Sequence, residues 1–397
     1  MKPEFFKKKL KNGLTILFEK RNLPVVSISA NVMQGSGYEN EKEKGISHFC
    51  EHLLFKGTKK RAYKEIASEI EKKGGILNGY TDEEVTGFWN KIPSKHFSSG
   101  MEIVSDLILN PRFDKKEFEK EKKVILEEIK MYRDNPQAYV LFKIKEMLYK
   151  KPFGIEGIGT EKSVSGIKRE EIIKFYNSNY KTGRMILGVV GNTSIEEVED
   201  FANRFPKTQG NGKKIKIEKV NKQVEEIRKG IDQANLAVGF HISSLKEKNR
   251  YNYEIFNAIL ASGMSSKLFE EIREKRGLAY GVKGMIEQGK DYGYYVIYIG
   301  TTKDKVKLCK EIVLKEIKNI KNLKKRDLEE AKEQLIGLRK VESEESVGVM
   351  NELVQEEIAG NADEYYKYDE RINEVKLDNI KKISKLKSYS SFALVPE

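Results

Sequence analysis

The chain has 397 residues, of which 39% are hydrophobic and 34% are charged, and its mean hydropathy is −0.60. This length predicts two or three domains, and the apolar content suffices for folded cores, which excludes a disordered chain. The net charge is +13, but Lys and Glu alternate throughout the sequence, so we interpret the excess as a solvated surface and expect no nucleic-acid partner.

The sequence indicates neither a membrane segment nor an oxidising compartment. The longest apolar runs fall far short of the roughly 20 residues that span a bilayer. Residues 1–9 have no apolar core of the kind found in signal peptides. Two cysteines, Cys50 and Cys309, are too few for a disulfide framework. We therefore expect reduced thiols, a cytoplasmic location and no membrane partner.

The first half of the chain alternates short apolar runs with amphipathic stretches, which Gly and Pro residues separate. In chain order, these patterns predict strands at 14–20 and 25–33, helices at 46–56 and 62–73, strands at 76–81 and 85–92, helices at 95–109, 115–133, 137–149 and 168–177, a strand at 185–191 and a helix at 194–204. A polar stretch without periodicity follows, and it predicts a linker at 208–222 between a first domain, 1–207, and a second, 223–397.

The second half repeats the pattern of the first. It predicts a strand at 235–241, helices at 249–261 and 265–275, strands at 279–286 and 292–300, and helices at 304–319 and 326–340. Gly57 and Gly74 follow helices in the first half as Gly263 and Gly277 do in the second. We therefore predict an α+β fold, a tandem repeat of two homologous domains, each a mixed β-sheet with helices packed on one face.

A histidine pair marks the first half as the chemically active one. His48 and His52 lie four residues apart in the predicted helix 46–56, so they share one face, and two neutral imidazoles there can hold a zinc ion. Glu51 flanks the same face and is placed to take a proton from zinc-activated water. Cys50 points away from His48, and we interpret it as a buried thiol.

A catalytic zinc ion needs a third protein ligand and an open position. In the predicted helix 115–133, Glu117, Glu121 and Glu128 fall on one stripe, and the neighbouring apolar run 124–126 packs the helix. From the residues alone, these carboxylates could equally form a solvated face. The two remaining histidines, His96 and His241, are interpreted as structural or surface residues.

The order H-x-x-E-H in residues 48–52 resembles the inverted zinc motif of the inverzincins. With the segment Val-Ile-Leu-Glu-Glu at 124–128, the chain resembles the pitrilysin-type zinc metallopeptidase family, near its processing-peptidase branch with two-domain subunits of similar length. The resemblance implies one zinc ion per chain, with His48, His52 and Glu128 as its ligands. The neighbouring Glu127 is not expected to be a ligand, because its helical phase points it away from this face. The resemblance also implies that Glu121 supports the site from outside the ligand set.

Two further segments resemble the family. Residues 74–81 match its G-G-x-x-N-A-x-T pattern, with Gly79 where alanine is usual; the resemblance implies that Asn78, Gly79 and Tyr80 lie on an edge strand that pairs with the substrate backbone. Residues 265–280 match another family pattern, which implies that Arg273 and Tyr280 contact the substrate or the developing oxyanion.

Alignment of Gly57 with Gly263 places Glu254, Asn257 and Ala258 where the first half has its motif, so we expect no metal in the second half.

The resemblance implies a zinc endopeptidase whose substrates are oligopeptides or unfolded polypeptides, cleaved in a chamber closed by two chains. Because the metal motif and the Arg–Tyr pair occur in one sequence, we expect a homodimer in which Arg273 and Tyr280 serve the zinc site of the other subunit. Two alternatives stay open. The chain could be a non-catalytic assembly subunit, or a catalytic subunit that needs a different partner.

Overall fold

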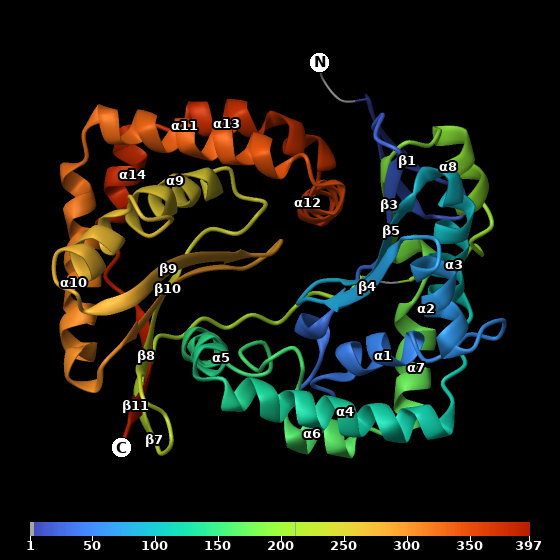
Figure 1. The fold of residues 1–397 in the computed structure, drawn as a ribbon, viewed down its shortest axis with the longest axis horizontal. Helices are drawn as coiled ribbons and strands as arrows, with labels where there is room; N and C mark the ends of the chain where they lie inside the picture. The colour runs from blue at the N-terminus through green and yellow to red at the C-terminus, as the bar shows by residue number, and fades with distance from the viewer. Residues whose placement is uncertain (1–3, 211) are drawn as a thin grey trace. The chain divides into compact units, whose positions relative to one another are not determined.

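The computed structural model describes residues 4–210 and 212–397, which form two compact units (Figure 1). The first unit comprises Met1–Ile129, Glu156–Lys216 and Glu342–Tyr365, and the second comprises Lys130–Ile155, Ile217–Val341 and Tyr366–Glu397. Residues 1–3 of the predicted first domain and Asn211 of the predicted linker lie outside the described residues. Among the described residues, no helix is both long and apolar enough to cross a membrane.

The first unit is built on a six-stranded mixed sheet in the order β1-β2-β6-β3-β5-β4. Only β2 and β6 pair in parallel within it. Its strands are β1 Glu4–Lys9, β2 Thr15–Lys20, β3 Val25–Val32, β4 Ile76–Thr81, β5 Thr86–Pro93 and β6 Met185–Gly191. The helices are α1 Ile46–Leu54, α2 Tyr63–Glu71, α3 Phe97–Leu109, α4 Lys115–Asp134, α6 Glu161–Gly166, α7 Arg169–Asn179, α8 Ile195–Ala202 and α12 Ser346–Ala359; the last turn of α4, from Lys130, belongs to the second unit.

The second unit contains a five-stranded sheet in the order β7-β11-β8-β10-β9. Its strands are β7 Gln223–Arg228, β8 Ala234–His241, β9 Ala279–Gln288, β10 Gly293–Thr301 and β11 Ser390–Pro396. Its helices are α5 Pro136–Leu148, α9 Arg250–Leu260, α10 Val306–Asn319, α11 Lys325–Glu342, α13 Tyr368–Glu374 and α14 Leu377–Ile383.

The two sheets have the same topology. If β2 to β6 are matched with β7 to β11 in chain order, the strand orders coincide and β1 is an addition at one edge. The match extends to direction, because β7 and β11 pair in parallel as β2 and β6 do, while the other pairs are antiparallel. The predicted α+β fold with two mixed sheets is therefore confirmed.

One face of each sheet is covered by helices from its own half of the chain. In β3, even-numbered residues such as Val26 and Ile28 enter the core beneath α1 and α3, because successive side chains of a strand point to opposite faces. The polar residues Ser27, Ser29 and Asn31 point to the opposite face, which α12 covers, and the hydroxyls of Ser27 and Ser346 hydrogen bond at 2.8 Å. Figure 1 shows α3 and α12 on opposite sides of this sheet.

The opposite faces are covered by an exchange of helices. α5 comes from the first half of the sequence but packs on β8 and β11, and α12 comes from the second half but packs on β3 and β6. Gly239 of β8 allows this approach, because a Cβ there would lie 2.9 Å from side-chain atoms of Ile144 and Leu148 of α5. The compact units therefore differ from a simple division of the chain at the linker 208–222.

Most predicted elements occur within a few residues of their expected bounds. The predicted helix 265–275 contains the π-helical segment Phe269–Glu274. Strands β1, β7 and β11 and helices α6, α12, α13 and α14 were not among the predicted elements.

A buried carboxylate caps the start of α1. The chain enters the helix through Gly45 at φ +96°, a backbone conformation that glycine adopts without strain. The two oxygens of Glu39 accept the backbone N–H groups of Gly45 at 2.9 Å and Ser47 at 2.7 Å. The ammonium group of Lys44, also buried, donates to the carbonyl of Ser36 at 2.7 Å. This arrangement satisfies amides that an uncapped helix would leave unpaired.

Replacement of Glu39 tests this cap through the pH dependence of stability. Burial raises the pKa of Glu39 from 4.5 to about 7, although Lys44 and the two amides lower it. Because the folded-state pKa is the higher one, the contribution of Glu39 is fully present below pH 4.5 and is lost as the pH rises to about 7. We expect the free energy of unfolding of Glu39→Gln to change less than that of wild type across this pH window. The difference between the two changes should be roughly 1–3 kcal/mol.

The measurement is urea unfolding of wild type and Glu39→Gln at pH steps across this window. The exposed Glu43 supplies a matched control, and Glu43→Gln should leave the wild-type profile unchanged. Identical profiles for wild type and Glu39→Gln would contradict this account of the cap.

Candidate metal centre

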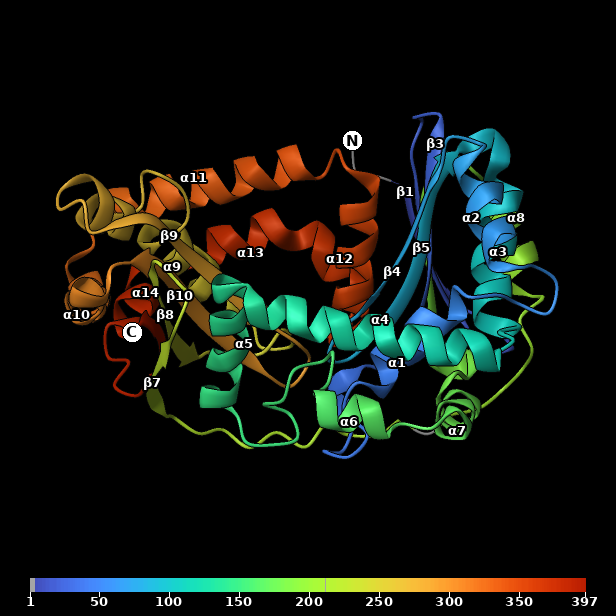
Figure 2. The same ribbon diagram turned by 60° about the horizontal axis from the view of Figure 1, so that its bottom comes forward.

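Apolar packing between α1 and α4 brings the predicted ligands together. Figures 1 and 2 show α4 running beside α1. The rings of Phe49 on α1 and Phe118 on α4 stack with centroids 5.0 Å apart and planes 9° apart. Ile125, seven residues after Phe118 on α4, is fully buried. Because these contacts fix the two helices against each other, the polar edge of one meets the polar edge of the other.

Three side chains converge at this edge. His48, His52 and Glu128 each offer one ligand atom, and the three atoms lie within 4.8 Å of one another. The Glu128 Oε2 atom lies 3.9 Å from Nε2 of His48 and 3.7 Å from Nε2 of His52. All three side chains are half-buried, whereas the neighbouring Glu127 is exposed. The structure thus groups Glu128, and not Glu127, with the histidines.

The electrostatic state of this cluster fits a divalent metal ion. Burial, with a smaller effect from His52, lowers the pKa of His48 to about 3, so this imidazole is neutral at physiological pH and offers a lone pair. Burial raises the pKa of Glu128, and His52 partly offsets that rise. The neutral imidazole of His48 and the carboxylate of Glu128 both present lone pairs to the same point, where a cation can bind. Two imidazoles and one carboxylate are the ligand set of many catalytic zinc sites.

Glu121 orients one ligand from outside the cluster. Its Oε2 atom lies 3.2 Å from Nδ1 of His52, and its Oε1 atom accepts from Nζ of Lys56 at 2.9 Å. Burial acts to raise the pKa of Glu121, but the hydrogen bonds with His52 and Lys56 outweigh it and leave the pKa lowered. An ionised Glu121 accepts the Nδ1 proton of His52, which leaves Nε2 free to face Glu128.

The same contact changes the basicity of His52. Burial lowers its pKa, but the hydrogen bond with Glu121 and the neighbouring carboxylates outweigh burial and raise the pKa above its usual value. Lys56 was not predicted for this site. Its position four residues after His52 was the available signal, because such spacing places two side chains one above the other near a helix end.

Glu51 lies in the turn of α1 between the two histidines and is buried. Its Oε2 atom accepts from Oγ1 of Thr81 at 2.9 Å. Burial raises the pKa of Glu51, with smaller opposing effects from His52 and the Thr81 hydroxyl. A carboxylate with a raised pKa accepts a proton more readily at neutral pH.

The segment predicted to bind substrate is strand β4. It ends the sheet, since it pairs only with β5 in the strand order. Asn78 is exposed on it, and the Tyr80 hydroxyl donates to Oδ1 of Asn31 at 3.0 Å. A Cβ at Gly79 would lie 2.9 Å from Oε1 of Glu51, so the glycine borders the carboxylate.

Arg273 and Tyr280 belong to the second unit. Arg273 lies in the π-helical segment, and its guanidinium carbon is 5.1 Å from the centroid of the Tyr280 ring. Tyr280 lies on β9, an edge strand of the five-stranded sheet, and is 84% exposed.

The repeat positions in α9 have other partners. Glu254 accepts from the Tyr368 hydroxyl at 2.6 Å, and Asn257 accepts from the Tyr295 hydroxyl at 2.9 Å. These polar groups are engaged in the packing of the second unit.

The remaining candidates lie outside the cluster. Cys50 is fully buried, and burial raises its pKa to about 12, which makes the thiol inert. The Nε2 atom of His241 lies 2.9 Å from the carbonyl of Val220 in the second unit. His96 ends the short turn that precedes α3.

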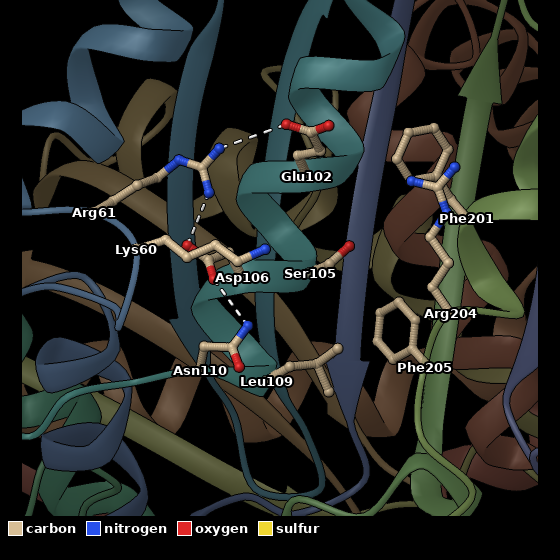
Figure 3. A pocket seen from close by; sticks show the side chains of 10 residues that line it. All are labelled: Lys60, Arg61, Glu102, Ser105, Asp106, Leu109, Asn110, Phe201, Arg204 and Phe205. Atoms are coloured by element: carbon tan, nitrogen blue, oxygen red, sulfur yellow. Dashed lines mark hydrogen bonds and ion pairs between the residues drawn. The ribbon is translucent and has the colours of Figure 1, made fainter.

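A separate pocket of about 320 Å³ lies between α3 and the end of α8 (Figure 3). Its central carboxylate, Asp106, already accepts from Arg61 at 2.9 Å, Asn110 at 2.9 Å and Thr58 at 2.6 Å. None of the predicted site residues lines it.

Two family models together match most of the chain. Residues 15–161 match the model described as insulinase (peptidase family M16), and residues 166–335 match the model described as the peptidase M16 inactive domain. A protein named as an uncharacterised zinc protease of Rickettsia bellii is 36% identical over 343 residues, 84% of this chain and 83% of that protein.

The chain belongs to peptidase family M16.

Two further proteins are also similar to the chain. The beta subunit of the mitochondrial-processing peptidase of Bos taurus is 34% identical over 194 residues, 49% of this chain and 40% of that subunit. A crystal structure described as a protease from Helicobacter pylori matches with a TM-score of 0.92 at 20% identity, over 99% of this chain and all of that one. The fold and the family are therefore those that the sequence resemblance implied.

The contacts of Glu121 predict its effect on metal affinity. We expect Glu121→Gln to weaken zinc binding by about 10- to 100-fold, because the amide is a poorer acceptor for the His52 N–H group. We expect Lys56→Met to weaken it less, since it removes only the second partner of Glu121. The measurement is competition with a chromogenic chelator. Glu117, which pairs with Lys120 on the same helix, supplies the control variant Glu117→Gln. Wild-type affinity in Glu121→Gln would contradict this role.

Proposed function

We propose that this chain is a zinc-dependent endopeptidase that cleaves flexible peptides. The observation that carries the proposal is the convergence of His48, His52 and Glu128 around one point, with Glu51 on the same turn of α1. This set supplies three ligands and leaves a fourth position for water or substrate, as catalytic zinc sites require. The names of the M16 relatives as zinc proteases support the choice of metal.

Each polar residue has a distinct role in this proposal. Zinc, when bound, supplies Lewis acidity that polarises a peptide carbonyl and lowers the pKa of water. Glu51 accepts a proton from the attacking water and passes it to the departing amine nitrogen. Glu121 holds the ring of His52 in orientation through Nδ1, with Lys56 as its counter-ion. The buried setting of Glu51 favours the proton-accepting step near neutral pH.

The edge strand β4 is the proposed substrate-binding element. One side of β4 pairs with β5, so its other side is the edge at which an extended peptide could pair. The Gly79 N–H group donates to Oδ1 of Asn78 at 2.8 Å, and a bound peptide that used this group would replace that contact. Main-chain pairing of this kind recognises any unfolded segment, whatever its side chains. We therefore propose oligopeptides and unfolded polypeptides as the substrate class, with Asn78, Gly79 and Tyr80 as the contact residues.

We further propose that two chains form a homodimer that encloses the substrate. The proposal assigns Arg273 and Tyr280 to the active site of the other subunit, where an arginine and a phenol can stabilise the developing oxyanion. The exposure of Tyr280 supports such a role, because a phenol ring left 84% exposed is available to another molecule.

A side-by-side assay of wild type and Glu51→Gln tests the peptidase proposal. We expect purified wild type to cleave an unstructured peptide of roughly 15–30 residues. Glu51→Gln should lose activity by at least about 100-fold, because the amide cannot accept the proton, and it should retain zinc. The measurements are product formation by mass spectrometry and metal content by elemental analysis.

Two outcomes would count against the proposal. Full activity in Glu51→Gln would remove Glu51 from the reaction. A zinc-loaded wild type that cleaves none of several peptides would favour a non-catalytic or partner-dependent subunit.

Mixed dimers test whether Arg273 and Tyr280 act between subunits. A Glu51→Gln chain and a Tyr280→Phe chain are each defective alone in this proposal, but a mixed dimer contains one site with an intact Glu51 and an intact Tyr280. We expect the mixture to recover up to about a quarter of wild-type activity per chain, since half of the random dimers are mixed and each has one intact site. A mixture no more active than its components would refute action between subunits.

A further inference from the structure

Strand β4 has two chemically different faces. Tyr80 points toward β3, where its hydroxyl donates to Asn31, and Asn31 in turn donates to Ser29 at 2.8 Å. Gly79 and Thr81 alternate with Tyr80 and therefore point to the other face, beneath α1. The face of β4 that meets α1 therefore carries Gly79 and, two residues later, the hydroxyl of Thr81.

Both of these residues border the carboxylate of Glu51. Oγ1 of Thr81 donates to Oε2 at 2.9 Å, and no other hydrogen bond to the Glu51 side chain is present among the described residues. The second oxygen, Oε1, lies over Gly79, where a Cβ would approach it to 2.9 Å and would approach Cε2 of the Phe55 ring to 2.8 Å. The carboxylate of Glu51 therefore lies between the Thr81 hydroxyl, which donates to it, and Gly79, which has no side chain.

We infer that Thr81 is a positioning residue for the general base: its hydroxyl holds the carboxylate of Glu51 in the space left by Gly79. This inference rests on the proposed function, because it assigns Thr81 a role through Glu51. Strand β4 then has two roles, in binding the peptide and in positioning the general base. Its free edge is proposed to hold the peptide, and its α1-facing side holds the group that accepts the proton.

The position of β4 itself does not depend on Glu51. The strand is paired with β5 along its length, with Thr81 opposite Thr86. The Tyr80 ring crosses Gly87 of β5 in close contact to reach Asn31, which anchors β4 to the sheet a second time. A loss of the Thr81 hydroxyl therefore leaves the strand in place, and the buried carboxylate of Glu51 then has no hydrogen-bond donor among the residues that the structure describes.

The test compares Thr81→Val, Thr81→Ser and Thr86→Val with wild type. Thr81→Val removes the hydroxyl at nearly constant volume, and Thr81→Ser retains it. Thr86→Val is the matched control, because it removes a hydroxyl from the opposite residue of the same strand pair, where the donor contacts the carbonyl of Gln34 instead. For each protein, kcat and KM for an unstructured peptide, the zinc affinity and the thermal midpoint are measured.

We expect Thr81→Val to lower kcat by about 10- to 100-fold, the effect of losing a hydrogen bond to a charged group. KM and zinc affinity should stay near wild type, and Thr81→Ser should restore kcat. Thr86→Val should lower the thermal midpoint while leaving kcat near wild type. Wild-type kcat in Thr81→Val would overturn the inference, and so would a rise in KM at unchanged kcat, since that would place Thr81 in peptide binding.

A second measurement separates this inference from the proposed function. If wild type cleaves no peptide, the proposed function fails, and the orientation of Glu51 decides the inference by itself. Crystal structures of wild type and Thr81→Val should show the Glu51 carboxylate in different rotamers. The same Glu51 rotamer in both structures would overturn the positioning role whatever the activity.

Discussion

The stacked pair of Phe49 and Phe118 is the contact on which the rest of the candidate site depends. These rings join α1 to α4 inside the core of the first unit, and their positions along the two helices determine which polar residues meet at the rim. One turn from this contact, His52 meets Glu121, and further along α4 both histidines meet Glu128. Apolar packing thus provides the precision that half-buried charged groups cannot provide for themselves, because such groups gain little from isolated pairing in contact with water.

Burial at this rim also sets the protonation states. Within the described part of the chain, the carboxylate oxygen paired with His48 is Oε2 of Glu128 at 3.9 Å, too far for a hydrogen bond, and burial keeps His48 neutral. Glu121, by contrast, supplies His52 with a partner that raises its basicity. The two histidines therefore differ although they lie on the same helix face. A metal ion at this point would meet one imidazole held by burial alone and one held by a charged neighbour. This difference between the two histidines comes from Glu121 on α4 and not from the H-x-x-E-H residues on α1.

Local sequence patterns were sufficient for the helix that carries the histidines, but the choice of Glu128 over Glu127 also needed the spacing in the family that the sequence resembles. The structure groups Glu128 with the histidines. Local patterns were not sufficient for Lys56 and Thr81, whose roles depend on which element packs against which. Strand β11 illustrates the same limit, since it is short and its partners β7 and β8 lie more than a hundred residues earlier. The exchange of α5 and α12 has no local signature, because either helix presents an apolar face that would suit either sheet.

That exchange has a consequence for the order in which the molecule is made. The sheet of the first unit is complete once residue 191 has been synthesised, yet its second face is covered by Ser346–Ala359. Until the ribosome has added those residues, the polar row of β3 and the surface of β6 lack their covering helix. Domains generally fold as units while a chain emerges. In this chain the first unit reaches its final packing only when nearly all of the polypeptide has been synthesised, so one face of its sheet lacks its covering helix through most of translation.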